Sequence, residues 1–173
     1  MKLPKKLVKQ LINGFKEQAH VDYFSHLYIN EGAKFCFCCF GGHALFVMSL
    51  DGAPLPKRLS TDNLKGISYK ELKELIPLSG DIMDLSTAGK SAHINSNYIN
   101  AFNVVYTSNE SVALGDNVCL NFKKTQHLLE LIKTAVNKSE LFIEFKAIHP
   151  VKLKFAYESP EVNVMAILTT ATK

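Results

Sequence analysis

Several features that assign a location or a chemistry are missing from this sequence. No apolar run approaches the roughly 20 residues that a membrane-spanning helix needs, and residues 1–18 lack the apolar core and cleavage site of a secretory signal peptide. Three of the four cysteines lie within Phe35 to Phe40, a spacing that provides no disulfide framework. We therefore expect an intracellular protein with reduced thiols and no membrane association.

Catalytic motifs are also missing. Gly41-Gly42 is not followed by the Lys-Ser/Thr pair of a phosphate-binding loop, and none of the six histidines lies in a motif with Ser, Cys or a carboxylate partner. Asp81 and Asp84 flank the start of a predicted strand, where aspartate more often serves turn formation than acid–base chemistry. We therefore expect a protein that is not an enzyme and has no cofactor.

A metal site in the cysteine-rich segment is an alternative, because Cys36, Cys38, Cys39 and His43 all carry zinc-binding groups. In a strand, however, alternation places Cys36 and Cys38 on one face and Cys39 on the other, and no second pair with Cys-x-x-Cys spacing exists. We expect no metal site and interpret these cysteines as small buried residues. A small enzyme that uses this strand is the least favoured function.

Composition allows a folded domain with a mild preference for anions. The 173 residues are 47% hydrophobic, enough to bury a core as one domain or two small ones. The net charge of +4 permits binding to nucleic acid or another polyanion without requiring it. The distribution of the lysines is therefore more informative than their number.

Three segments have apolar residues at the spacings of an amphipathic helix, and they begin near residues 4, 68 and 124. Ser68 is expected to cap the second helix, with Glu71 at the capping-box position and Pro77 after the last turn. The expected buried stripes are Leu3, Leu7, Val8, Leu11, Ile12 and Phe15; Leu72, Leu75 and Ile76; and Leu128, Leu129, Ile132, Ala135 and Val136.

Between these helices the sequence is typical of short strands separated by turns. Gly41-Gly42 indicates a tight hairpin between two of them. The predicted strands are 26–30, 34–40, 43–50, 81–87, 91–96, 101–107, 117–122, 140–145, 151–157 and 162–168.

Together these patterns predict an α+β fold in which helices cover one side of an antiparallel sheet. Each helix is followed by two or more strands, so the spacing of roughly 60 residues suggests a repeated helix–strand module. Residues 1–106 would hold two modules and a connector at about 51–66, rich in proline and polar residues, and residues 107–173 would form the third module.

Four consecutive segments carry a family resemblance: Ile132 to Ala135, Ser139 to Phe145, Pro150 to Phe155, and Val162 to Leu168. Their order resembles the C-terminal module of DNA sliding clamps, the ring-shaped processivity factors of DNA replication. In that family a helix ending near a Lys-Ala or similar pair precedes a Ser-x-x-hydrophobic-x-hydrophobic strand, a Pro-hydrophobic-x-hydrophobic-x-Phe strand and a final apolar strand. Residues 67–96 are similar to the same template, and the start of the chain is similar in layout to some phage clamps.

The resemblance implies a ring around duplex DNA, with basic helix faces lining its hole. Such a ring needs diffuse positive charge toward the phosphates and no tight contacts to bases. For each helix taken alone, the alternative to DNA binding is that its lysines only keep the exposed face of the helix in contact with water, which is the commoner role of such residues. The residues that the resemblance assigns to DNA are Lys5, Lys6, Lys9, Lys16, Lys123, Lys124 and Lys133.

A second implied element is an apolar groove in which polymerases and repair factors dock short peptides. By position this groove would involve Pro150, Val151, Met165, Ile167, Leu168 and Thr169. Alternating apolar residues on a strand are more often core than groove. The family's final strand also usually ends in Met-Pro or Ala-Pro, whereas this chain has Leu168-Thr169-Thr170.

The predicted function is thus a non-enzymatic sliding clamp that forms a homo-oligomeric ring on duplex DNA without sequence preference. The resemblance implies a DNA polymerase and an ATP-driven clamp loader as partners. The alternative, from a different class, is an interaction module of the same fold, an adaptor or decoy that does not encircle DNA.

Overall fold

The computed structural model describes residues 1–16, 24–41, 43–60, 62–92, 94, 99–100, 103–104, 106–107, 110–114, 118–138, 140, 142–149 and 152–172. The helices with assigned bounds are α1 (Lys5–Phe15), α2 (Tyr69–Leu75) and α4 (Phe122–Ala135). The strands are β1 (Lys2–Pro4), β2 (His26–Asn30), β3 (Phe35–Phe40), β4 (Ala44–Leu50), β5 (Lys65–Ser68), β6 (Ile82–Asp84), β7 (Lys90–Ser91), β8 (Val118–Cys119), β9 (Glu144–His149), β10 (Lys152–Tyr157), β11 (Val162–Thr169) and β12 (Ala171–Thr172).

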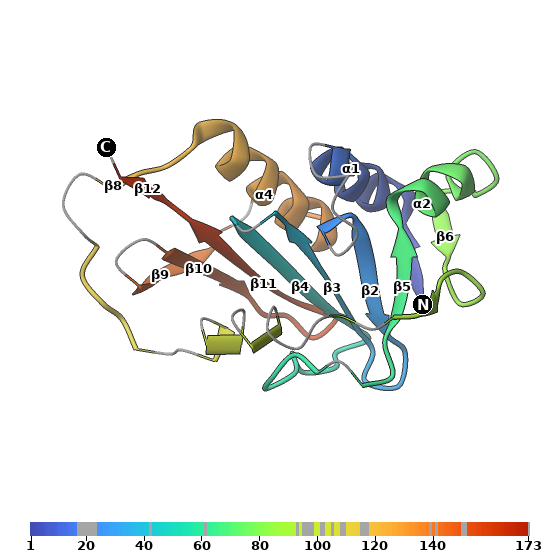
Figure 1. The fold of residues 1–173 in the computed structure, drawn as a ribbon, viewed down its shortest axis with the longest axis horizontal. Helices are drawn as coiled ribbons and strands as arrows, with labels where there is room; N and C mark the ends of the chain where they lie inside the picture. Colours follow the sequence, from blue (N-terminus) through green and yellow to red (C-terminus); the bar gives the residue numbers. More distant parts are fainter. Residues whose placement is uncertain are drawn as a thin grey trace.

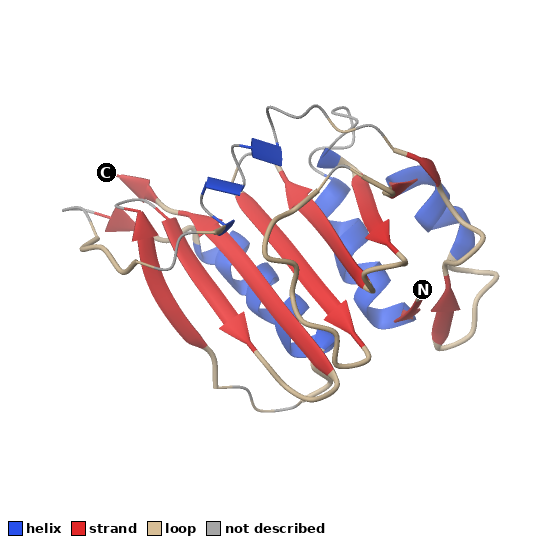
Figure 2. Cartoon of the chain, turned by 90° about the horizontal axis from the view of Figure 1, so that it is seen from below, coloured by secondary structure: helices blue, strands red, loops and turns tan. Residues whose placement is uncertain are grey.

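One large sheet organises the molecule. Eight strands pair antiparallel in the order β7-β5-β2-β3-β4-β11-β10-β9, while β1 pairs with β6 and β8 with β12 in two small sheets. The helices α1, α2 and α4 lie on one face of the large sheet (Figure 1 and Figure 2). The predicted α+β class, with these helices on one side of an antiparallel sheet, is therefore confirmed.

Two units of the same connectivity meet at the centre of the sheet. In each, a short strand leads into a helix and then into a three-stranded meander: β1-α1-β2-β3-β4 and β8-α4-β9-β10-β11. The last strands of the two meanders, β4 and β11, pair antiparallel over seven residues, and α1 packs beside α4. The chain around α2 has a different connectivity, because β6 pairs back to β1 and β7 to β5.

The apolar stripe of α1 packs on the sheet as predicted. Leu7, Val8, Leu11, Ile12 and Phe15 are all buried. The expectation that the helix includes Leu3 was wrong, because Leu3 lies in β1, paired with Met83 of β6. The helix begins at Lys5, directly after Pro4. Proline suits this position because it has no backbone N–H, and the N–H groups at the start of a helix have no partner within the helix.

The caps of the other two helices come from polar side chains. The Ser68 hydroxyl accepts a hydrogen bond from the backbone N–H of Glu71, as the sequence predicts. The Glu71 carboxylate accepts from the N–H of Gly89, a contact that the capping-box pattern does not predict. In α4, Asn121 caps the helix, and Leu131 replaces Leu129 in the buried stripe, since Leu129 is 37% exposed.

The sheet separates two apolar cores. The larger core lies between the sheet and the helices and includes Cys36 and Cys38. The smaller core lies on the opposite face, under the residues that follow β4, and includes Cys39. The predicted alternation of the cysteine side chains is confirmed, because Cys36 and Cys38 lie in the larger core and Cys39 lies in the smaller core on the other face of β3.

Some predicted strands were wrong. The described residues of 99–106 are helical, not extended. Ile99, Asn103 and Tyr106 are buried, three residues spaced as on one side of a helix, and this turn lies on the face of the sheet away from α1 (Figure 1). The strand predicted at 140–145 is β9, shifted to 144–149, where Phe145 packs on Phe155 of β10 at 6.1 Å between ring centroids.

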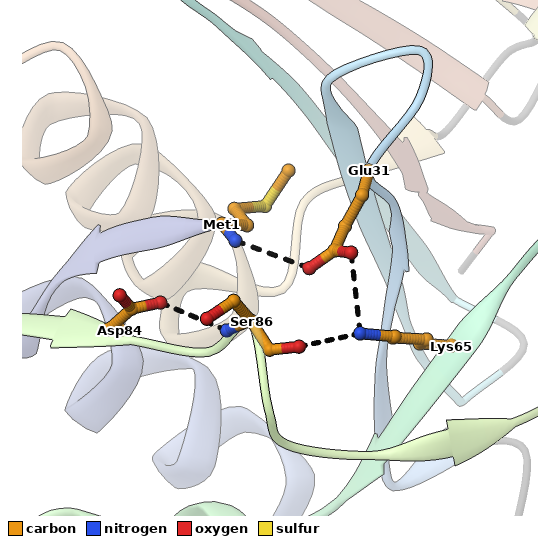
Figure 3. Close-up of polar contacts among 5 residues, drawn as sticks. All are labelled: Met1, Glu31, Lys65, Asp84 and Ser86. Atoms are coloured by element: carbon orange, nitrogen blue, oxygen red, sulfur yellow. Dashed lines mark hydrogen bonds and ion pairs between the residues drawn. The ribbon is translucent and has the colours of Figure 1, made fainter.

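A network of hydrogen bonds connects the start of the chain to the large sheet (Figure 3). The Glu31 carboxylate accepts from the Met1 amino group at 3.4 Å and from Lys65 Nζ at 3.3 Å, and Lys65 also donates to the Ser86 carbonyl. The hydrogen bond and charge of Lys65 lower the pKa of Glu31. The Ser86 N–H donates to Asp84 and lowers the pKa of that carboxyl in the same way.

Within the part of the chain that the structure describes, none of the helices has both the length and the apolar character needed to cross a bilayer.

Candidate nucleic-acid interface

The exposed side of α1 is a basic stripe. Lys6, Lys9 and Lys16 are exposed, and with Asn13 they follow the three- and four-residue spacing that keeps side chains on one side of a helix. No acidic residue lies in the first turn of α1. These four residues are called the α1 basic stripe below.

Two of the predicted DNA-binding lysines are less accessible to a ligand than the lysines of the α1 basic stripe. Lys5 is half-buried, and its Nζ donates to the carbonyl oxygen of Ser79 at 2.6 Å. Lys133 is half-buried in the last turn of α4, where a cation stabilises the negative end of the helix dipole. Both positions have a local structural role that explains a lysine without any ligand.

The C-terminal half of α1 packs closely against α4. His127 of α4 contacts the carbonyl oxygen of Gln10 through Nε2 at 3.0 Å. Its ring also lies nearly perpendicular to the ring of Phe40, with 5.3 Å between the ring centroids, and Phe40 in turn packs on Phe15. Gly14 permits this approach, because a Cβ atom at that position would collide with the rings of Phe40 and His127. These contacts fix the position of α4 relative to the α1 basic stripe.

A pocket of about 810 Å³ opens where the end of α1 meets the start of α4. It brings together three lysines predicted to contact DNA, namely Lys16 from α1 and Lys123 and Lys124 from α4. We call it the α1–α4 pocket. Its other lining residues are Asn13, Gly14, Phe40, His43, Ala44, Asn121, His127 and Leu128.

The charge of the α1–α4 pocket favours anions. None of the described residues that line it is an aspartate or glutamate. The N-terminus of α4, capped by Asn121, lies at the pocket and adds the positive end of the helix dipole. Since the α1 basic stripe leads into the pocket at Asn13 and Lys16, the two features form one basic surface. A chain of phosphates is a fitting ligand for such a surface.

The opposite face of the sheet carries two adjoining pockets. One, of about 570 Å³, is lined by the residues after β4, including Leu55 and Pro56, and the other, of about 560 Å³, by β9 and β10. Met165, predicted to bind a partner, is half-buried and lines both, as do Lys154 and Glu158. We call these two pockets the outer groove.

Lys154 and Tyr106 shape the outer groove. Lys154 Nζ donates to the carbonyl oxygen of Tyr106 at 3.1 Å and lies over its ring, while the Tyr106 hydroxyl donates to the carbonyl oxygen of Pro56 at 2.6 Å. Burial lowers the pKa of Lys154, and the nearby charge of Lys146 lowers it further. Burial raises the pKa of Tyr106.

The other residues predicted to bind a partner lie elsewhere. Ile167 is buried in the smaller core, and Leu168 is 1% exposed in the larger core, so neither side chain offers surface to a peptide. Thr169 is half-buried, and its N–H donates to the carbonyl oxygen of His43. Pro150 and Val151 lie outside the described residues. The outer groove therefore depends on Met165 and on residues that the sequence did not indicate.

The cysteine-rich strand has the properties of a packed core. Burial raises the pKa of Cys36 to about 12, and it also raises the pKa values of Cys38 and Cys39. Thiols with such pKa values stay protonated near neutral pH, and the thiolate is the form that binds metals or attacks electrophiles. Among the described residues, no group of three His, Cys, Asp or Glu side chains is arranged to hold a metal ion.

Sequence patterns indicated the lysines of the basic surface but not the pocket that unites them. Asn121 carries a local signal, since an asparagine directly before an amphipathic segment is a common N-cap. No local sequence signal indicates His43 and Phe40 as pocket residues. They line the pocket because β3 pairs with β4 and α1 packs on α4.

In comparisons with known proteins, no family model matches this chain, and no curated protein matches it.

Proposed function

We propose that this chain is a non-enzymatic DNA sliding clamp, a processivity factor that encircles duplex DNA as a homo-oligomeric ring and tethers replication proteins to it. The observation that carries the proposal is the continuous basic surface on the helix-covered side of the sheet. There the α1 basic stripe runs into the α1–α4 pocket, and Lys16, Lys123 and Lys124 come together from two helices.

The chemistry of the basic surface suits sequence-independent binding. Its lysines are mobile, hydrated cations that attract phosphates without reading base edges. They project from helices anchored on a broad sheet, so the charges keep their spacing while the DNA moves past. A site that had to recognise a sequence would instead need side chains that reach into a groove.

The connectivity supports the same proposal. Two strand–helix–meander units lie side by side, with α1 and α4 on one face and one continuous sheet behind them. The clamp resemblance of the C-terminal part of the chain implies repeated helix–strand modules whose helices face the DNA. A DNA polymerase and a clamp loader are the partners that the proposal requires.

A second candidate function is an adaptor or decoy of the same fold that binds a protein and does not encircle DNA. The outer groove favours it, because this groove combines Met165 and Leu55 with the polar groups of Lys154 and Glu158 on the face away from the helices. In a clamp the same groove would serve partner docking, so ring formation distinguishes the two functions.

The DNA-binding part is tested by charge removal. We expect that a Lys6→Gln, Lys9→Gln, Lys16→Gln variant binds duplex DNA more weakly than the unmodified protein. The dependence of log K on log salt should fall by about 0.9 for each phosphate that the variant no longer neutralises. The measurement is fluorescence anisotropy of a labelled duplex over a series of salt concentrations.

The matched control removes three exposed lysines that lie neither on a helix nor in the α1–α4 pocket, as Lys34→Gln, Lys57→Gln, Lys90→Gln. This variant has the same net charge as the first and should keep the affinity and salt dependence of the parent protein. An equal decrease in affinity in both variants would mean that only the total charge matters, and the proposed surface would then be wrong.

A further inference from the structure

The strand β9 forms one edge of the large sheet. Among the described residues its only strand partner is β10. Phe145, within β9, is 62% exposed, and Phe142, just before it, is 92% exposed. An edge strand with exposed aromatic residues is a template for pairing with another strand.

The outer edge of β9 makes a backbone contact with Val112. The N–H of Val112 donates to the carbonyl oxygen of Ala147 at 2.9 Å, so this carbonyl points away from β10. Because backbone groups alternate in direction along a strand, the N–H and C=O of Phe145 also point away from β10. Up to Ala147, where the register with β10 shifts, the edge therefore offers its hydrogen bonds at odd-numbered residues.

We propose that β9 pairs antiparallel with β9 of a second copy of this chain, with the two Phe145 residues opposite each other. In this register Phe145 exchanges both backbone hydrogen bonds with its counterpart, which is the arrangement for residues whose polar groups point outward. Glu144 then lies opposite Lys146 of the second copy, and the two-fold symmetry repeats that pair.

Charge selects this register over its neighbours. Centring the pair on Lys146 would place two lysines opposite each other, and centring it on Glu144 would place two carboxylates opposite each other, both of which are destabilising. A shift by one residue would match outward-pointing backbone groups with inward-pointing ones. Only the register centred on Phe145 combines opposite charges with a full set of hydrogen bonds.

The side chains on both faces also match. Phe145 packs on Phe155 at the rim of the larger core, so the second Phe145 would extend that core across the edge. Glu144 and Lys146 line the outer groove on the other face. The pairing thus continues both layers of the molecule from one copy to the next.

The segment around Val112 competes with the second copy. If the same register continues to Ile143, the N–H of Ile143 in the second copy reaches the carbonyl oxygen of Ala147 in the first copy. This carbonyl is the group that accepts a hydrogen bond from Val112. The dimer and the Val112 contact therefore exclude each other at this carbonyl. The segment 110–114 acts as a cover that lowers the affinity of the edge.

This inference rests on the proposed function, because it specifies one contact of the proposed homo-oligomer. Its evidence is separate and comes from β9 and its contact with Val112. The test is sedimentation velocity of the full chain, without DNA, over a wide range of concentrations. We expect Glu144→Lys and Lys146→Glu each to weaken the dimer about tenfold, since each change acts twice across the symmetry axis. The double variant with both changes should dimerise like the parent protein, a rescue that a folding defect would not give.

Val112→Pro removes the competing N–H and should tighten the dimer, whereas Val112→Ala keeps the N–H and serves as its control. A monomer at all concentrations, even with Val112→Pro, would overturn the inference. So would a dimer that neither single charge change weakens. A dimer that follows these expectations, in a protein that is retained equally on circular and linear DNA, would support the inference and contradict the clamp.

Discussion

At the scale of single residues, Gly14 decides how closely the two helices of the basic surface approach. It lies in α1, where alanine would ordinarily be the better helix former. Here a Cβ atom would collide with Phe40 and His127, so the close contact outweighs helix propensity.

We predict that Gly14→Ala lowers the free energy of unfolding by about 1–3 kcal/mol, the usual cost of an overpacked contact. Chemical denaturation followed by circular dichroism measures the change. Gly80→Ala is the control, because a Cβ atom at Gly80 has no neighbour within 4 Å. Equal effects of the two substitutions would show that Gly14 has no special packing role.

The cysteines differ in their surroundings in a way that reactivity can measure. Cys36, Cys38 and Cys39 are buried with raised pKa values, whereas Cys119 in β8 is half-buried. We predict that a thiol reagent near neutral pH modifies Cys119 first and the other three only as fast as the protein unfolds. Cys119→Ser should remove the fast phase. Rapid reaction of several thiols in the folded protein would contradict the buried assignment of β3.

At the scale of elements, Asn103 holds the segment after β4 against the sheet. Asn103 is 5% exposed, and its side chain donates to the carbonyl oxygen of Leu59 and accepts from the Leu59 N–H, both at 2.8 Å. The segment has no regular structure of its own from Asp51 to Leu64 among its described residues, so this amide replaces a strand partner.

We predict that Asn103→Ala destabilises the protein by about 1–3 kcal/mol, because it leaves two buried backbone groups of Leu59 without partners. Asn100→Ala is the matched control, since Asn100 is exposed and its side-chain oxygen accepts a hydrogen bond from Arg58. Its expected cost is below about 0.5 kcal/mol. Thermal unfolding of both variants checks the difference, and a similar destabilisation of both would mean that Asn103 does not fix this segment.

Local pattern predicted the elements with strong periodicity. The strands β2, β3, β4, β10 and β11 and the helices α1 and α4 agree with their predicted ranges within about three residues, because their apolar residues repeat at a spacing that one conformation satisfies. The strands β1 and β5 were missed, and the described residues of 99–106 were assigned to a strand although they are helical, because each depends on partners far away in the sequence. The same reason hides the α1–α4 pocket, whose residues span from Asn13 to Leu128.

At the scale of the whole molecule, the sheet separates two surfaces of different character. The helix-covered side holds the basic surface, and the far side holds the outer groove with Met165. A protein that holds DNA on one side and a partner on the other needs this separation. In the proposed ring, β9 at the sheet edge supplies a contact between copies.

The most direct test of the clamp proposal compares circular and linear duplex DNA. Protein assembled on a nicked circular duplex is passed through a gel-filtration column at a salt concentration that weakens simple electrostatic binding. We predict that the protein stays with the circle and dissociates when a restriction enzyme linearises it, because a ring slides off a free end. Equal retention of the bound protein on circular and linear DNA would contradict the clamp proposal.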